Sequence, residues 1–163
     1  MRTFPPGPAG DPIAHWAEQL TKELRLGAQI LTDHNITPPA ANTVFFGGGT
    51  PSLLGRQLPK ILDVVRECFG IAPGAEITSE ANPESTSPEL FDCWRAGGVN
   101  RLSLGMQSSE PRVLALLDRQ HDPARAVAAI EEAQAAGFEH LNLDLIYGTP
   151  GAVSYTHLRA HET

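Results

Sequence analysis

Hydrophobic residues recur along the chain with two different periods, and the two periods alternate. Stretches with three-, four- or seven-residue spacing predict helices. The first follows Asp11 and Pro12, a good N-cap and a residue suited to the first helical position. Its apolar face consists of Ile13, Trp16, Leu20, Leu24 and Leu31. Further helices are predicted to begin near Pro59, at Ser87-Pro88, at Ser109-Glu110-Pro111 and at Asp122-Pro123.

Short β-rich stretches separate these helices. They cover residues 43–46, 76–82, 101–107 and 140–146. Strands that alternate with helices of ten or more residues are joined by right-handed crossovers, which makes the sheet parallel. The sequence therefore predicts an α/β fold with four parallel strands. This pattern fits a segment of a (β/α) barrel or an open doubly wound sheet.

Three of the predicted strands carry polar residues on one face. Parallel strands are usually buried on both sides and apolar throughout, whereas these strands alternate with a period of two. The polar sets are Thr78, Glu80 and Asn82; Arg101, Ser103, Gly105 and Gln107; and Asn142 and Asp144. An antiparallel sheet with one wet face would alternate in the same way, but the intervening helices argue against it. We therefore expect these faces to line an interior that holds a polar ligand.

The carboxyl ends of the strands collect the residues best suited to binding, and this is the edge where α/β proteins place their chemistry. These ends carry Gly47-Gly-Gly-Thr50, Glu80, Gln107 and Asp144. The glycine run is neither a Walker loop nor a dinucleotide fingerprint. Glu80 is interpreted either as a ligand-binding carboxylate or as the partner of Arg101 in an internal ion pair. Together the strand ends suit a ligand with amino, carboxylate and hydroxyl groups.

Composition narrows the class of protein. The 163 residues include 12 Lys and Arg against 19 Asp and Glu, a formal charge of −7, which disfavours nucleic-acid binding as the main task. Neither a membrane-spanning apolar run nor a secretory signal is visible, so we expect a cytoplasmic protein. The two cysteines, Cys68 and Cys93, lack C-x-x-C spacing. This count excludes a disulfide framework, a four-cysteine zinc site and an iron–sulfur cluster ligated within this chain.

Five motifs in order carry a family resemblance over residues 11–151. They are Thr43-Val-Phe-Phe-Gly-Gly-Gly-Thr-Pro-Ser-Leu-Leu54, Glu80-Ala-Asn-Pro-Glu-Ser85, Arg101-Leu-Ser-Leu-Gly-Met-Gln-Ser108, Leu117-Asp-Arg119 and Asn142-Leu-Asp-Leu-Ile-Tyr-Gly-Thr-Pro-Gly151. The chain resembles the radical S-adenosylmethionine (SAM) proteins related to oxygen-independent coproporphyrinogen III oxidase. The second and third motifs are similar to those of the haem-chaperone (HemW) branch rather than the oxidase itself.

The resemblance implies a partial (β/α) barrel that holds SAM and a [4Fe-4S] cluster at its top. Cofactor-binding positions would be Gly48, Gly49, Thr50, Glu80, Gln107, Arg119 and Asp144. From spacing alone, Arg119 is a solvated cation at a helix end; the resemblance makes it a carboxylate partner of SAM. Haem chaperones of this kind bind haem and deliver it to respiratory proteins. Two alternatives stay open: a coproporphyrinogen III dehydrogenase, and a cluster-free α/β module that binds a small ligand.

The chain departs from the family pattern at both ends. The C-x-x-x-C-x-x-C cluster loop, expected before residue 11, is absent, and residues 152–163 do not continue the family. We interpret residues 1–10 as a flexible segment, 11–151 as a partial radical SAM core and 152–163 as a non-native tail that resembles a translated sequencing adapter. On this interpretation the chain is an internal fragment, inactive alone, with no metal ligands of its own.

Overall fold

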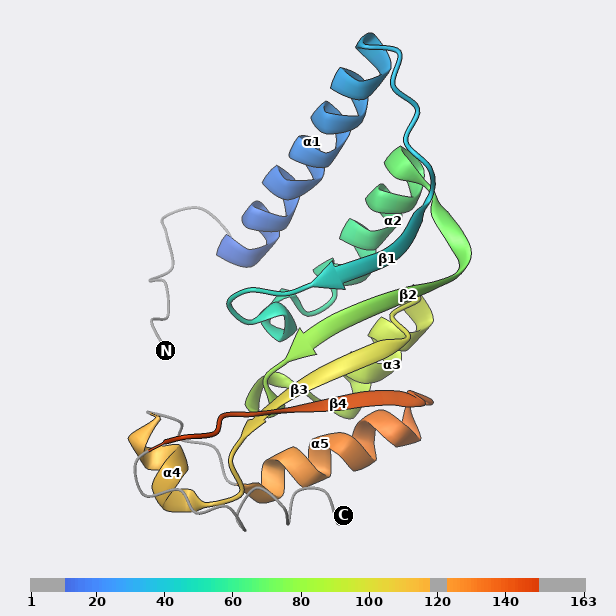
Figure 1. Cartoon of the computed structure of the whole chain (residues 1–163). Helices are drawn as coiled ribbons and strands as arrows, with labels where there is room; N and C mark the ends of the chain where they lie inside the picture. Colours follow the sequence, from blue (N-terminus) through green and yellow to red (C-terminus); the bar gives the residue numbers. More distant parts are fainter. Residues whose placement is uncertain (1–10, 118–122, 150–163) are drawn as a thin grey trace.

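Four parallel strands form a single sheet in the order β1-β2-β3-β4 (Figure 1). The computed structural model describes residues 11–117 and 123–149. The strands are β1 (Ala41–Phe46), β2 (Ile71–Ala81), β3 (Arg101–Gln107) and β4 (His140–Leu145). Each adjacent pair is parallel, which confirms the α/β fold class with four parallel strands. The main difference in bounds is that β2 starts at Ile71, five residues before the predicted strand.

Apart from the first helix, which precedes β1, the helices join successive strands, as the crossover rule requires. They are α1 (Pro12–Asp33), α2 (Gln57–Phe69), α3 (Pro88–Gly97), α4 (Pro111–Leu116) and α5 (Pro123–Ala135). The predicted N-caps are in place: the side chain of Asp11 accepts from Ile13 N at 3.0 Å, and that of Ser87 from Leu90 N at 3.3 Å. Two short 3-10 helices, η1 (Pro51–Leu54) and η2 (Pro83–Ser85), were not predicted. Within the described ranges, no helix could cross a bilayer.

The hydrophobic core lies between one face of the sheet and the helices. Its strand residues are Ile77, Ala81, Leu102 and Leu104, and its helix residues include Leu58, Leu62, Phe91 and Trp94. Trp94 is fully buried, and its Nε1 donates to the carbonyl of Gly55 at 2.9 Å. Because side chains alternate along a strand, packing of this face turns Glu80, Ser103 and Gln107 to the opposite face.

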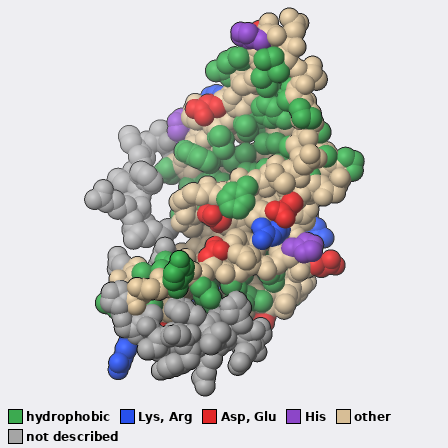
Figure 2. Space-filling model, viewed as in Figure 1, with side chains coloured by type: hydrophobic (Ala, Val, Ile, Leu, Met, Phe, Trp, Pro, Cys, Tyr) green, Lys and Arg blue, Asp and Glu red, His purple; other side chains and the backbone are tan. Residues whose placement is uncertain are grey.

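The first helix packs less deeply than its apolar pattern predicts. Trp16, expected on the inner face, is 53% exposed, and Ala17 is the buried residue of α1. The reason is that α1 packs mainly against α2 and η1. This contact covers only a narrow strip of the helix surface, which includes Ala17 and leaves Trp16 outside it. Figure 2 shows hydrophobic side chains exposed along this helix. Beside it, β1 is an edge strand of the sheet, and Phe45 is 61% exposed.

The two tryptophans provide a matched test of this packing. Replacing Trp94 with Ala empties a fully buried site and removes the bond to Gly55, so we expect a loss of about 3–5 kcal/mol in unfolding free energy. The same change at Trp16 removes an exposed ring and should cost about 0.5 kcal/mol or less. Urea denaturation of both variants measures the difference, and equal losses would contradict this placement of α1.

Candidate functional site

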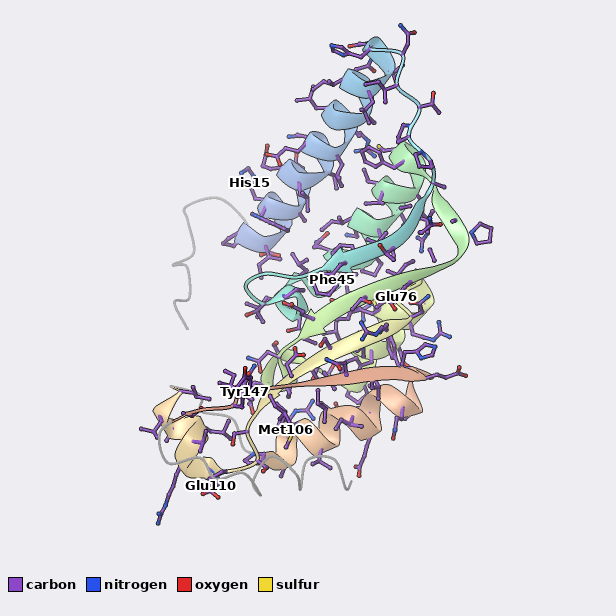
Figure 3. The ribbon with its side chains drawn as sticks, in the orientation of Figure 1. His15, Phe45, Glu76, Met106, Glu110 and Tyr147 are labelled. Atoms are coloured by element: carbon purple, nitrogen blue, oxygen red, sulfur yellow. The ribbon has the colours of Figure 1, made fainter. Side chains whose placement is uncertain are left out.

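A polar cavity of about 270 Å³ lies at the carboxyl ends of the strands. It is lined by Gly49, Thr50, Pro51, Glu80, Ala81, Asn82, Gly105, Gln107 and Asp144. Five of the sequence-predicted site residues thus meet in one cavity: Gly49, Thr50, Glu80, Gln107 and Asp144. In Figure 3, Met106 marks the carboxyl end of β3, and Tyr147 marks the segment that follows β4. Glu76 lies further from the cavity, nearer the start of β2.

The glycine run after β1 folds toward the carboxylate of β2. Gly48 and Gly49 have φ values of 80° and 65°, a backbone region in which residues with a Cβ are rare. This turn lets the Gly48 N–H donate to Oε2 of Glu80 at 3.1 Å. At Gly47, a Cβ would collide with the ring of Phe45 and lie 3.2 Å from Oε1 of Glu80. Glycine is therefore needed here for close approach.

Glu80 is not the partner of Arg101. The guanidinium of Arg101 lies 3.6 Å from Oε1 of Glu76, which is four residues before Glu80 on the same strand face. The alternative reading of Glu80 as half of that ion pair is therefore wrong. No ion pair to Glu80 occurs within the described part of the chain, so its carboxylate faces the cavity with the Gly48 amide as its hydrogen-bond partner.

Gln107 holds an uncommon backbone conformation at the end of β3. Its φ is 67°, and left-handed backbone at a residue with a side chain typically costs about 1–3 kcal/mol. The pairing of β3 with β4 shifts register between Leu104 and Gln107. A Cβ on Gly105 would lie 2.8 Å from Nε2 of Gln107. The amide of Gln107 therefore occupies the space that a side chain at Gly105 would fill.

Asp144 enters the cavity from β4 and is half-buried. A carboxylate that leaves water needs hydrogen-bond donors. Ser103 Oγ donates to Oδ1 of Asp144 at 2.9 Å, and Asn142 Nδ2 donates to the same oxygen at 2.8 Å. The hydrogen-bond donors for this carboxylate are therefore supplied by uncharged neighbours. Asn142 and Ser103 were predicted only as members of polar faces, without this role.

A cluster of hydroxyl groups joins the loop after β1 to the loop after β2. The backbone N–H of Asn82 donates to Oγ of the buried Ser52 at 3.0 Å. The hydroxyls of Ser52 and Ser85 share a hydrogen bond of 2.5 Å, and Ser85 Oγ donates to the carbonyl of Asn82 at 3.0 Å. This clasp holds two walls of the cavity together. Both serines lie in the motifs, yet spacing alone does not show that they meet.

The η2 loop is tied down from its other side by α5. Arg125 Nη2 donates to the carbonyl and the hydroxyl of Thr86 at 3.2 and 3.0 Å, and it also pairs with Glu132 at 2.8 Å. Because the side chains of Arg125 and Glu132 are about three-quarters buried, water screens this pair less than a surface ion pair. The loop after β2 is thus fixed from two directions.

The structure shows the remaining two predicted binding residues differently, because it describes Gly48 but not Arg119. Gly48 contributes its amide to Glu80 but does not line the cavity. Arg119 lies outside the described residues, so its predicted role toward a carboxylate stays a prediction.

The described residues do not fit an iron–sulfur cluster. Within residues 11–117 and 123–149, no group of three or more His, Cys, Asp or Glu side chains could hold a metal ion. Cys68 and Cys93 are free, half-buried thiols on α2 and α3. Cys68 precedes the start of β2, whereas the cavity lies at the far end of this 11-residue strand. At 3.3 Å per residue these two ends are roughly 30 Å apart.

Comparison with known proteins identifies the family. Residues 28–153 match the Radical SAM superfamily. The chain belongs to this superfamily. The match covers β1 to β4 and every cavity residue, and it confirms the family that the motifs predicted. Membership implies SAM and an iron–sulfur cluster as the cofactors of the family.

Several curated proteins resemble the chain closely. It is 57% identical over 137 residues to the protein named heme chaperone HemW of Mycobacterium tuberculosis H37Rv, covering 83% of this chain and 34% of that protein. HemW of Escherichia coli K12 is 44% identical over 109 residues, covering 66% of this chain and 29% of that protein. Oxygen-independent coproporphyrinogen III oxidase of Salmonella typhimurium LT2 is 33% identical over 136 residues, with 83% and 29% covered. The chain thus spans about a third of their length.

The fold has similar solved relatives. Coproporphyrinogen III oxidase (HemN) from Escherichia coli, described as a radical SAM enzyme, superposes with a TM-score of 0.75 at 31% identity. The superposition covers 91% of this chain and 35% of that one. Elp3 from Methanocaldococcus infernus gives a TM-score of 0.62 at 16% identity, over 94% and 40%, and shows the fold alone. These likenesses support the prediction of a partial TIM-type barrel.

The hydroxyl clasp can be separated from general stability by two serine variants. Ser52→Ala leaves the Asn82 N–H without its acceptor and should cost about 1–3 kcal/mol. Ser87→Ala removes an N-cap from α3 and should cost about 1 kcal/mol. Hydrogen exchange at the Asn82 amide is expected to accelerate in Ser52→Ala alone. Equal acceleration in both variants would mean that the clasp does not hold these loops.

Proposed function

We propose that this chain provides the SAM-binding part of a radical SAM protein of the haem-chaperone type. The observation that supports it is the meeting of Glu80, Gln107 and Asp144 with the glycine loop in one cavity, inside the segment that matches the superfamily. These residues come from four different strand ends, so only the folded sheet brings them together. Such convergence of polar groups in a cleft is typical of a ligand site.

The charge of the cavity suits SAM. Glu80 and Asp144 both line it, and no ion pair to either occurs in the described part of the chain. SAM carries a sulfonium and an ammonium group, so a cavity with two carboxylates favours it over an anionic ligand. The Gln107 amide adds a donor and an acceptor for the neutral polar groups of the ligand.

By family resemblance, Gly48, Gly49 and Thr50 hold the methionine end of SAM. Arg119, outside the described residues, would pair with the SAM carboxylate. Bound SAM, on one-electron reduction, would break its carbon–sulfur bond to give methionine and supply 5′-deoxyadenosyl radical chemistry. The contribution of this chain is to bind and orient the ligand. No chemical step is assigned to the cluster, because the described residues do not fit one.

Haem is the proposed cargo. This assignment rests on the higher identity to proteins named heme chaperone HemW, 57% and 44%, than to the coproporphyrinogen III oxidase, 33%. We further propose haem-accepting respiratory proteins as partners and the cytoplasm as the location. The second candidate is the oxidase function, which the similarity to the HemN structure supports.

Two isosteric variants test SAM binding. Glu80→Gln and Asp144→Asn each remove a negative charge from the cavity while keeping its shape. Each is expected to weaken SAM binding by about tenfold or more, as measured by isothermal titration calorimetry. Glu76→Gln is the matched control, because Glu76 lies on the same strand face but pairs with Arg101 outside the cavity lining. Its affinity should stay near that of the unmodified chain.

The proposed SAM site would be wrong if the unmodified chain showed no binding to SAM. It would also be wrong if all three charge-removing variants weakened binding equally, because a general loss of negative charge would then explain the effect.

A chimera separates the two candidate functions. Residues 11–149 replace the corresponding segment of the Mycobacterium HemW relative, whose similarity covers 137 residues. The reconstituted chimera is expected to bind haem, seen as a Soret absorption shift, and to leave coproporphyrinogen III unoxidised in a porphyrin fluorescence assay. The parent relative is the control for both readouts. Oxidation of coproporphyrinogen by the chimera would support the second candidate instead.

A further inference from the structure

Three side chains form a closed triangle of hydrogen bonds beneath the cavity. Asn142 Nδ2 donates to Ser103 Oγ at 2.9 Å and to Asp144 Oδ1 at 2.8 Å, and Ser103 Oγ donates to the same Oδ1 at 2.9 Å. Neither Asn142 nor Ser103 lines the cavity, whereas Asp144 does. The two residues therefore reach the cavity only through the carboxylate that they hold.

The geometry admits a single arrangement of protons. A carboxylate only accepts, so the amide of Asn142 must present Nδ2 to Asp144 rather than its carbonyl oxygen. The Ser103 hydroxyl has one proton, which it donates to Asp144, and its lone pair accepts from Asn142. Both amide protons of Asn142 and the hydroxyl proton are thus used inside the triangle.

The backbone keeps the triangle in place. Ser103 and Asn142 are register partners on adjacent strands, and Asp144 follows Asn142 on the same face of β4. The residue between them, Leu143, points to the other face and packs against the hydrophobic core. Ser103 is 7% exposed, so water competes little for its hydroxyl. Packing of Leu143 in the core therefore fixes the strand position from which Asp144 extends.

Two of the three bonds end on Asp144, and both end on the same oxygen, Oδ1. Within the described residues, neither bond to Asp144 reaches Oδ2, and the carboxylate borders the cavity. We propose that Asn142 and Ser103 are positioning residues, which bind Oδ1 of Asp144 and leave Oδ2 for one hydrogen-bond donor of the ligand. The inference rests on the proposed SAM site and assigns two residues that act through Asp144. Restricting the carboxylate to one rotamer before binding lowers the entropy lost on binding.

A double-mutant cycle tests this coupling. With Asp144 present, Asn142→Ala and Ser103→Ala are each expected to weaken SAM binding about tenfold in calorimetric titrations. In the Asp144→Ala background the same changes should weaken it less than twofold, because their target is gone. Ser103→Thr keeps the hydroxyl and should restore most of the affinity lost in Ser103→Ala. Losses that add independently of Asp144 would overturn the proposal.

Asn42 supplies the matched control. It is an exposed asparagine on β1, so Asn42→Ala makes the same chemical change on another strand. Its effect on SAM affinity should be less than twofold in both backgrounds. An Asn42→Ala loss equal to that of Asn142→Ala would show a general effect of strand polarity and overturn the specific role of Asn142.

A second cycle distinguishes this inference from the proposed function. The same single and double variants are unfolded in urea without SAM. The midpoint losses of Asn142→Ala and Asp144→Ala should not add, because each removes the same hydrogen bond. If the unmodified chain does not bind SAM, the proposed function fails, and this ligand-free cycle still decides the positioning role. Additive midpoint losses would overturn it.

Discussion

The packing of one face of the sheet is the constraint on which the rest of the structure depends. Leu102 and Leu104 of β3 are fully buried against the helices, and the pleat then turns Ser103 and Gln107 to the other side. On β4, Leu143 packs against the core in the same way, which turns the next residue, Asp144, to the cavity side. The orientation of these polar side chains is thus set by neighbouring leucines that do not line the cavity. A change of one residue in strand register would reverse both faces together.

Loops complete what the strands begin. The strands supply Glu80, Gln107 and Asp144, while the segments after β1 and β2 form the remaining walls. The bond from the Asn82 N–H to Ser52 Oγ joins these two segments, and the bond from Arg125 to Thr86 ties the second of them to α5. Rigid strands therefore fix the carboxylates, and side-chain bonds between loops fix the backbone amides around them. This division suits a site that binds a flexible, polar ligand.

Much of this arrangement could be predicted from local sequence. Caps at Asp11 and Ser87, the strand alternation and the glycine run all act within a few residues, so their pattern is visible in one dimension. One of the two interpretations of Glu80, the ion pair with Arg101, was wrong because period two places Glu76 and Glu80 on the same face, and only the three-dimensional register selects between them. Trp16 was misplaced because helical spacing shows an apolar side without showing how much of it is covered.

The left-handed backbone at Gln107 has a consequence for how the sequence can change. Glycine at this position would relax the conformation and, judged by folding alone, would be an improvement. It would also delete the amide that borders the cavity. A screen that selects only for thermal stability would therefore favour glycine at this position and lose a polar group from the cavity. Backbone strain and a cavity-lining amide thus belong to the same residue, so stability and the shape of the cavity cannot be changed separately at Gln107.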